Sequence, residues 1–223
     1  IRAFSAHAGT VYSVAFSPDG NKVLTGNVDR NARLWDITTG TEIRTFSGHT
    51  KAIRSVAFSS DGTTVLTGSS DDTAKLWDAD TGDLIRTYEG HTGEVYSVAY
   101  SSDGQRILTG SKDKTARIWD TQTGNEVFAL QGHSGMVLCV DFSPDGTEVL
   151  TGSSDRTMRI WDAETGAKIF GHHTDTILSS IFSPNGRWIL TGSRDQTARL
   201  WDVNTGALLT VFQGHTGEVN SVA

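Results

Sequence analysis

The residue types of a serine hydrolase site occur together near the end of the sequence. His173, Ser193 and Asp195 precede Trp201, which begins a Trp-Asp pair. A serine nucleophile, a histidine base and an aspartate that orients the base are the groups that acyl transfer by a hydroxyl requires. We therefore ask whether these side chains form a catalytic site or a structural hydrogen-bond network.

The same set recurs along the chain, always with the aspartate 22 positions after the histidine. The sets are His49, Ser69, Asp71 and Trp77; His91, Ser111, Asp113 and Trp119; His133, Ser153, Asp155 and Trp161; and His173, Ser193, Asp195 and Trp201. A hydrolase needs one such set beside an oxyanion hole, and the chain has no Gly-x-Ser-x-Gly motif. Buried indole, hydroxyl, imidazole and carboxylate groups each need a hydrogen-bond partner, which these residues can supply to one another. We interpret the sets as structural and expect no catalytic residue among them.

The first set of this kind is altered. Asn27 stands where the other sets have serine, between His7 and Asp29. We expect a weaker network in this unit.

The elements that position these residues also repeat. Trp35, Trp77, Trp119, Trp161 and Trp201 are separated by 42, 42, 42 and 40 residues, and residues 48–89 match residues 90–131 at 21 of 42 positions. In the first unit, the pattern predicts strands over 11–17 and 22–26, joined by an Asp-Gly turn, and further strands over 31–37 and 41–46. No stretch has the 3.6-residue apolar period of a helix. Four short strands in each repeated unit are typical of a β-propeller.

Three motifs carry a resemblance to a known family. Gly-His near the start of most units, Ser-x-Asp, and Trp-Asp at the end of the third strand resemble the WD-repeat β-propellers over essentially the whole chain, although alanine precedes His7 and histidine precedes His173. The resemblance implies an all-β fold of four-stranded antiparallel blades, with five full repeats over 8–46, 50–88, 92–130, 134–170 and 174–212. It also implies a buried hydrogen-bond chain in each unit, from the Trp N–H through the serine and the histidine to the aspartate.

The strand count leaves the ring incomplete. Residues 1–4 and 215–223 are predicted to be strands of incomplete blades, and most propellers of the family that the chain resembles have seven blades. We therefore expect residues 1–223 to be one propeller region cut from a longer, seven-bladed ring. Closure with five or six blades and completion by another copy of the chain are the alternatives. Unpaired strand edges would promote self-association.

Composition limits the class of protein. The chain is 36% hydrophobic and 20% charged, and it has no apolar run near the ~18 residues that a membrane span requires. Its net charge of -7 argues against a dedicated nucleic-acid binder. The single cysteine, Cys139, excludes an internal disulfide and gives no metal-ligand spacing. We expect a soluble, cytoplasmic protein without a metal or cofactor, in which Cys139 is a small buried residue.

Candidate binding residues are those that differ between near-identical units. In the family that the chain resembles, the third and fifth residues after each histidine, and the residue between Ser and Asp, line one face around the central channel. Carried over to this chain, these positions give the candidate partner contacts Tyr12, Arg54, Tyr96, Glu94, Met136, Leu138, Leu178, Lys112 and Arg194. This mixture of aromatic, basic and apolar side chains suits a protein or peptide partner. Packing between blades is the alternative role for Leu138 and Leu178.

Three functions remain to be compared. The composition of the candidate face favours a non-catalytic interaction scaffold that serves as the docking or sensor region of a larger multidomain protein. The alternative is an enzymatic or small-ligand-binding propeller that uses the central channel. Such propellers usually gather acidic, histidine or metal-ligating side chains at the channel mouth, whereas the candidate face has only scattered glutamates, so the candidate face disfavours this alternative. Nucleic-acid binding through Arg54, Lys112 and Arg194 is disfavoured by the acidic total charge.

Overall fold

The computed structural model describes residues 9–164 and 166–223 and contains five four-stranded antiparallel sheets. Neighbouring strands in each sheet are consecutive in the sequence. The sheets, which we number as blades 1 to 5 in chain order, confirm the predicted all-β class with four-stranded blades. The strand predicted at 1–4 and the first histidine, His7, lie outside the described residues.

Each blade uses its four strands in the same order. The first strands are β1 (Val11–Phe16), β5 (Ile53–Phe58), β9 (Val95–Tyr100), β13 (Val137–Phe142) and β17 (Ile177–Phe182). The second strands are β2 (Lys22–Asn27), β6 (Thr64–Ser69), β10 (Arg106–Ser111), β14 (Glu148–Ser153) and β18 (Trp188–Ser193). The third strands are β3 (Asn31–Asp36), β7 (Ala74–Asp78), β11 (Ala116–Asp120), β15 (Thr157–Asp162) and β19 (Ala198–Asp202). The fourth strands are β4 (Glu42–Ser47), β8 (Leu84–Tyr88), β12 (Glu126–Leu130), β16 (Gly166–His172) and β20 (Leu208–Phe212).

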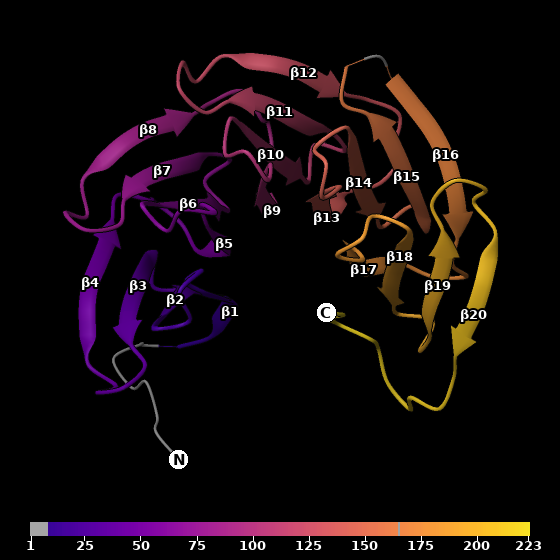
Figure 1. Cartoon of the computed structure of the whole chain (residues 1–223), viewed down its shortest axis with the longest axis horizontal. Coiled ribbons are helices and arrows are strands. Elements are labelled where there is room, and N and C mark those ends of the chain that lie inside the picture. The colour runs from indigo at the N-terminus through magenta and orange to yellow at the C-terminus, as the bar shows by residue number, and fades with distance from the viewer. Residues whose placement is uncertain (1–8, 165) are drawn as a thin grey trace.

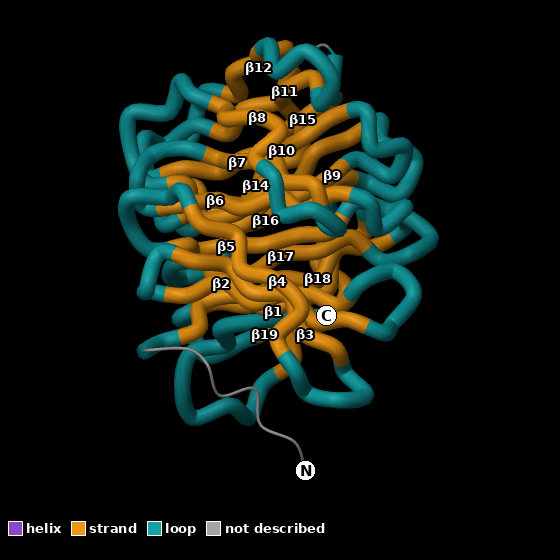
Figure 2. The backbone as a smooth tube through the Cα atoms, turned by 90° about the vertical axis from the view of Figure 1, so that its left-hand side faces the viewer, coloured by secondary structure: helices purple, strands orange, loops and turns teal. Residues whose placement is uncertain are grey.

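The blades lie side by side in an arc around an open centre, with the first strand of each blade innermost and the fourth outermost (Figure 1). The view from the side shows the strands in the middle and loops gathered on two opposite sides (Figure 2). Because strand direction alternates, the loop before each first strand and the turn after each second strand lie on the same side. The candidate contacts follow the histidines and therefore lie at this mouth of the channel, which we call the histidine-side mouth.

Close packing between blades explains the glycine that stands next to last in each second strand. A Cβ atom built on Gly110 of blade 3 would lie 2.7 Å from Val140 Cγ1 of blade 4. Real Cβ atoms do not approach a neighbour so closely, so the site requires glycine. Val140 in turn belongs to a core cluster with Leu108 and Trp161. Apolar layers of this kind join each blade to the next.

Blade 1 has an uncovered face. Val14 of β1 is 64% exposed, whereas Val98, at the same position of β9, is 6% exposed because blade 2 packs on it. Phe16 is also exposed. The side of blade 1 that faces the opening of the arc therefore presents the apolar surface that other blades bury.

The C-terminal segment lies against blade 5. The Val219 amide donates to the Ser193 carbonyl (3.0 Å), and the Val222 amide donates to Ser179 Oγ (3.2 Å). No strand is assigned in 213–223, so the strand predicted at 215–223 is present only as an extended segment bonded to blade 5. Among the described residues, no helix has the length and apolar character needed to cross a bilayer.

Candidate functional site

The repeated polar residues form a buried hydrogen-bond chain, which is clearest in blade 3. Trp119 Nε1 donates to Thr109 Oγ1 (2.9 Å), and this oxygen lies 2.7 Å from His91 Nε2. His91 Nδ1 lies 2.8 Å from Asp113 Oδ2. This hydrogen-bond chain links the loop before β9, the second strand and the third strand. It therefore fixes the two inner hairpins of the blade to the loop that precedes them.

The same chain occurs in blades 2, 4 and 5, with distances of 2.7–2.9 Å. Its members there are Trp77, Thr67, His49 and Asp71; Trp161, Thr151, His133 and Asp155; and Trp201, Thr191, His173 and Asp195.

The hydroxyl in the chain is a threonine, and the prediction that serine holds this place was wrong. Thr109 lies inside β10, two residues before Ser111, where its side chain reaches both the indole and the imidazole. Ser111 ends the strand, and its hydroxyl accepts the Asp113 amide (3.1 Å) and donates to the Gly93 carbonyl (2.8 Å). Ser69, Ser153 and Ser193 likewise accept the amide of the aspartate two residues on. The serines therefore close the turn after the second strand.

These contacts exclude the hydrolase arrangement in the described sets. Ser111 and Ser193 have no exposed surface, and their hydroxyls bond to main-chain groups rather than to the histidine. A nucleophile must contact both its base and the substrate. The predicted structural role of the sets is the one that these contacts support.

Burial and hydrogen bonding together decide the protonation states of the histidine and the aspartate in each hydrogen-bond chain, as blade 4 shows. Burial would raise the pKa of Asp155, but hydrogen bonds from Thr157 and His133 outweigh it and lower the pKa to about 2. Burial lowers the pKa of His133, against the effect of Asp155. A neutral imidazole then donates from Nδ1 to the carboxylate and accepts the Thr151 hydroxyl at Nε2. Every polar side-chain atom of this hydrogen-bond chain thus has a partner.

Blade 1 keeps part of this arrangement. Trp35 Nε1 donates to Thr25 Oγ1 (2.8 Å), and Asn27 Oδ1 accepts the Asp29 amide (2.8 Å). Asn27 therefore takes the turn-closing role of the serines. The expectation of a weaker network depends on His7, which lies outside the described residues, and stays a prediction.

A second cluster lies at the histidine-side mouth and joins blades 1 to 3. The guanidinium carbon of Arg54 lies 4.5 Å from the ring centroid of Tyr12 and 5.8 Å from that of Tyr96. Arg54 Nε donates to Ser70 Oγ (2.7 Å), and Nη2 donates to Glu94 Oε2 (3.1 Å). The arginine is therefore held between two aromatic rings, one from each neighbouring blade.

Glu94 is the centre of charge in this cluster. It accepts hydrogen bonds from Ser70 (2.8 Å) and from Lys112 Nζ (3.0 Å) as well as from Arg54. Burial would raise the pKa of Glu94, but the bonds from Lys112 and Ser70 and the two positive charges lower it. Glu94 and Lys112 also line a cavity of about 320 Å³ between blades 2 and 3. The cluster of Tyr12, Arg54, Ser70, Glu94, Tyr96 and Lys112 is called the mouth cluster below.

The remaining candidate contacts lie on blades 4 and 5. Met136, Leu138 and Leu178 are partly buried. Arg194 is exposed and lies 3.4 Å from Glu218 of the C-terminal segment. The hydrogen bonds and ring contacts at this mouth thus join the candidates of blades 1 to 3, whereas Arg194 pairs with the C-terminal segment.

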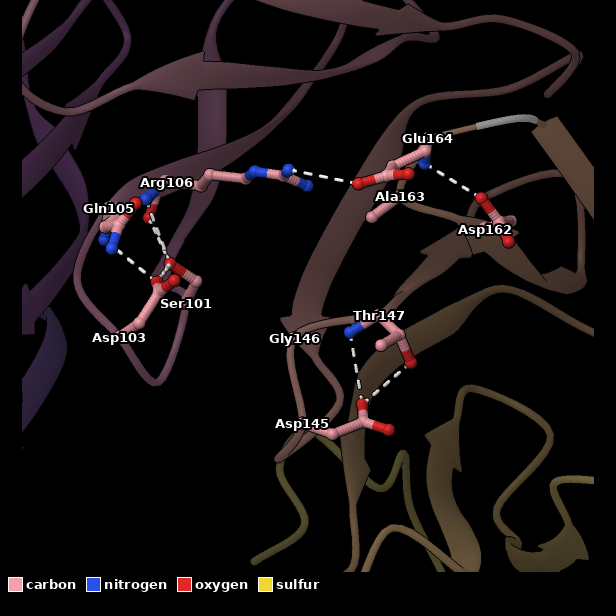
Figure 3. Close-up of a pocket in the computed structure, with 10 residues that line it drawn as sticks. All are labelled: Ser101, Asp103, Gln105, Arg106, Asp145, Gly146, Thr147, Asp162, Ala163 and Glu164. Carbon is pink, nitrogen blue, oxygen red and sulfur yellow. Dashed lines mark hydrogen bonds and ion pairs between the residues drawn. The ribbon is translucent and has the colours of Figure 1, made fainter.

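A larger cavity, of about 390 Å³, lies between blades 3 and 4 on the opposite side of the disc and is lined by Asp103, Asp145, Asp162 and Glu164 (Figure 3). Its aspartates are engaged by their own turns, and Glu164 pairs with Arg106 of the neighbouring blade (3.6 Å). Asp103 accepts from Ser101 and the Gln105 amide, and Asp145 accepts from Ser143 and Thr147. Asp19 and Asp61 make the same turn contacts in other blades. The cavity is therefore a product of repeated turn chemistry, and it is not the candidate site.

Sequence reasoning missed two groups. The threonine of each hydrogen-bond chain stands ten residues before its tryptophan in every unit, and this fixed spacing is the signal that could have identified it. Ser70, which holds both Arg54 and Glu94, occupies the position between serine and aspartate but was not among the candidate contacts. Its role depends on a side chain from the neighbouring blade, which a single unit does not reveal.

Comparison with known proteins assigns the family. A family model described as IFT122 first beta-propeller matches residues 55–223, and one described as WD domain, G-beta repeat matches residues 1–36. Protein Mut11 of Chlamydomonas reinhardtii is 44% identical over 41 residues, and a guanine nucleotide-binding protein subunit beta of Nicotiana tabacum is 48% identical over 42 residues. These segments cover 18% and 19% of this chain and 11% of each relative, which is the length of one repeat.

Neither family model describes an enzyme. The first model spans well over half of the chain and agrees with the repeated four-stranded blades. The chain belongs to the WD40-repeat β-propeller family.

Proposed function

We propose that this propeller region is a non-catalytic interaction platform that docks a protein or peptide at the mouth cluster. WD40 domains generally bind proteins, and the observation that carries the more specific proposal is the Arg54 side chain held between Tyr12 and Tyr96. Tyrosine and arginine dominate the binding energy of many protein interfaces. Here they form one group at the channel mouth.

Rigidity of the cluster supports a docking role. The hydrogen bonds from Arg54 to Ser70 and Glu94 fix a side chain that would otherwise lose much rotamer freedom on binding. Tyr12 is 43% exposed, so a large part of the side chain is available for contact. A partner that packs on this surface gains contact area at a low entropic cost.

The docking surface that we propose extends beyond the mouth cluster. Met136, Leu138 and Leu178 supply an apolar sector on blades 4 and 5, and Arg194 supplies a charged edge. The three partly buried apolar residues suit the core of an interface, and the exposed Arg194 suits its rim.

Pairing of the cations argues against nucleic acid as the partner. Arg54 and Lys112 both bond to Glu94, and Arg194 lies beside Glu218. Neutralised cations release few counterions when they meet a phosphate backbone, so they contribute little to affinity. A protein or peptide surface remains the partner that fits.

We further propose that the region is the docking or sensor part of a larger cytoplasmic protein with a seven-bladed ring. The exposed face of Val14 and Phe16 supports the longer ring, because Val98 and Val140, at the position of Val14, are each buried by the preceding blade. A blade of the same type, from the same protein or from a second copy, is the cover that fits this face. Exposed edges of this kind also promote self-association.

Affinity capture from the source cells tests the docking proposal. Wild-type protein should retain at least one stoichiometric protein that the Tyr12→Ala/Tyr96→Ala double variant loses, as identified by mass spectrometry. Phe128→Ala is the matched control, because Phe128 is an exposed aromatic residue on the outermost strand of blade 3. Equal capture by all three proteins, each with an unchanged melting temperature, would place the interaction elsewhere.

A further inference from the structure

Asp141 departs from the pattern of the innermost strands. It lies opposite Leu150 in the pairing of β13 with β14. The residues at this register position in the other blades are Ala15, Ala57, Ala99 and Ile181. A carboxylate therefore stands on blade 4 where the other blades have an apolar side chain.

One carboxylate oxygen replaces a missing bond between blades. Elsewhere a serine of the first strand accepts a main-chain amide of the next blade, as Ser97 does from Val140 (3.2 Å). On blade 4 this position is Cys139, whose sulfur lies 3.2 Å from Ser180 Oγ. Asp141 Oδ2 instead accepts the Phe182 amide (2.9 Å). A neutral acceptor would serve this bond equally well, so the negative charge is not needed for it.

The charge has no counter-ion among the described residues. None of the ion pairs found there involves Asp141, whereas Glu94, near the other end of the innermost strands, is paired with both Arg54 and Lys112. Its ionisable neighbours are Cys139, whose thiol pKa burial raises to about 12, and Tyr100, whose pKa burial also raises. Both are uncharged at neutral pH. An unpaired charge in such surroundings is costly, and a bound cation would remove most of that cost.

Asp141 lines a cavity with room for a small ligand. This cavity has a volume of about 370 Å³ and lies among the innermost strands, near the ends that lead into the Ser-x-Asp-Gly turns. Its walls include Phe58, Val98, Tyr100, Val140 and Ile181. The site is thus at the opposite end of these strands from the mouth cluster.

The lining selects the chemical class of the ligand. One carboxylate cannot supply the several oxygen ligands that a divalent metal ion prefers. Aliphatic and aromatic walls suit a hydrocarbon stem, and a carboxylate suits one positive charge at its end. We propose that this cavity binds an aliphatic primary ammonium group, with Asp141 as its counter-ion and the stem against Val98, Val140 and Ile181.

Titration of the chain with n-butylammonium chloride, followed by the NMR signal of the Phe182 amide, tests the proposal. The amide bonds to the carboxylate, so a saturable shift of its signal reports binding at this site. n-Butanol, which has the same stem without the charge, should give no saturable shift, and potassium chloride controls for ionic strength. Asp141→Asn keeps an acceptor for the Phe182 amide but loses the charge, so we expect the affinity for butylammonium to fall at least about tenfold.

A pH series gives a second test that needs no variant. Protonation of Asp141 removes the counter-ion, so butylammonium should bind the wild-type chain more weakly at pH 5 than at pH 7.5. Equal binding of the amine and the alcohol, equal binding by wild type and Asp141→Asn, or the absence of a saturable shift with millimolar amine would overturn the proposal.

The source of the ammonium group can be separated in the same assay. Nα-acetyl-lysine amide carries the group on a peptide-like side chain, whereas cadaverine is a free amine. Binding of both supports a lysine side chain of a partner as the ligand, and binding of cadaverine alone supports a free small amine. The mouth cluster is not involved, so failure of this test leaves the docking proposal untouched.

Discussion

The guanidinium of Arg54 lies over the ring of Tyr12, 4.5 Å from carbon to centroid, although the two residues belong to different blades. They occupy the same position of successive repeats, five residues after His7 and His49. Because blades pack in register, equivalent positions of neighbouring innermost strands are adjacent at the channel mouth. Variation at one position of the repeat therefore produces a contact that no single repeat contains.

Removal of the Lys112 charge should raise the pKa of Glu94 toward its ordinary value. The Lys112→Met variant loses the 3.0 Å hydrogen bond and the positive charge that lower this pKa, while it keeps the length of the side chain. Carboxyl-carbon NMR titration of Glu94 measures the shift. Lys114→Met, a change in the same loop without a contact to Glu94, is the control, and an identical titration in both variants would show that the bond does not exist in solution.

Threonine rather than serine should dominate the stability of each hydrogen-bond chain. Thr109→Val keeps the shape of the side chain but leaves the Trp119 N–H and His91 Nε2 without a buried partner, so we expect a loss of about 3 kcal/mol. Thr92→Val is the control, since Thr92 is exposed and its amide, not its hydroxyl, bonds to Asp113. Urea unfolding at pH 7 gives both values. Equal losses would mean that the threonine hydroxyl is not the link in the chain.

Asp141 should make stability depend on pH with the opposite sign to the other buried aspartates. Burial raises the pKa of Asp141 from 3.8 to about 6, so the folded state binds this proton more tightly than the unfolded state does. The resulting stabilisation is complete below about pH 4 and is lost as the pH rises through 6. The free energy of unfolding of Asp141→Asn minus that of the wild type should therefore rise by roughly 2 kcal/mol between pH 4 and pH 7. Urea unfolding of both proteins at four pH values measures the difference. A difference that does not change with pH would show that Asp141 titrates normally.

The same substitution at equivalent valines should have different effects on different blades. Val98→Ala opens a cavity in the layer between blades 2 and 3 and should cost about 2 kcal/mol, whereas Val14→Ala, on the uncovered face of blade 1, should cost much less. Thermal unfolding of the two variants tests this pair. If Val14→Ala lowered the melting temperature as much as Val98→Ala, the face of blade 1 would be covered in solution, and sedimentation velocity would show whether a second copy covers it.

The repeat made the fold predictable. A repeat period of about 42 residues and short strand-like segments joined by turns such as Asp-Gly identified four strands in each unit, because strand and turn preferences reflect local backbone chemistry. The sequence pattern did not reveal whether Thr109 or Ser111 supplies the hydroxyl between the tryptophan and the histidine. The threonine recurs in all five units and the serine in four of them, and only the position of the residue relative to the end of β10 decides which one reaches the tryptophan.

The candidate site was predictable in part. The positions of Tyr12, Arg54 and Tyr96 followed from the differences between units and from the family resemblance. Their mutual stacking, and the role of Ser70 in holding Arg54, depend on how neighbouring blades approach one another. Asp141 was also missed, because its meaning comes from the loss of a serine at Cys139 and from a contact with Phe182 on the next blade.

The most direct test of the docking function is photo-crosslinking from the mouth cluster in the source cells. The full protein would carry p-benzoylphenylalanine in place of Tyr96 and, in a separate control, in place of Phe128 on the outermost strand of the same blade. We predict that position 96 crosslinks to a defined protein partner and that position 128 does not. Crosslinks to the same proteins from both positions, or from position 128 alone, would contradict the assignment of the mouth cluster as the docking site.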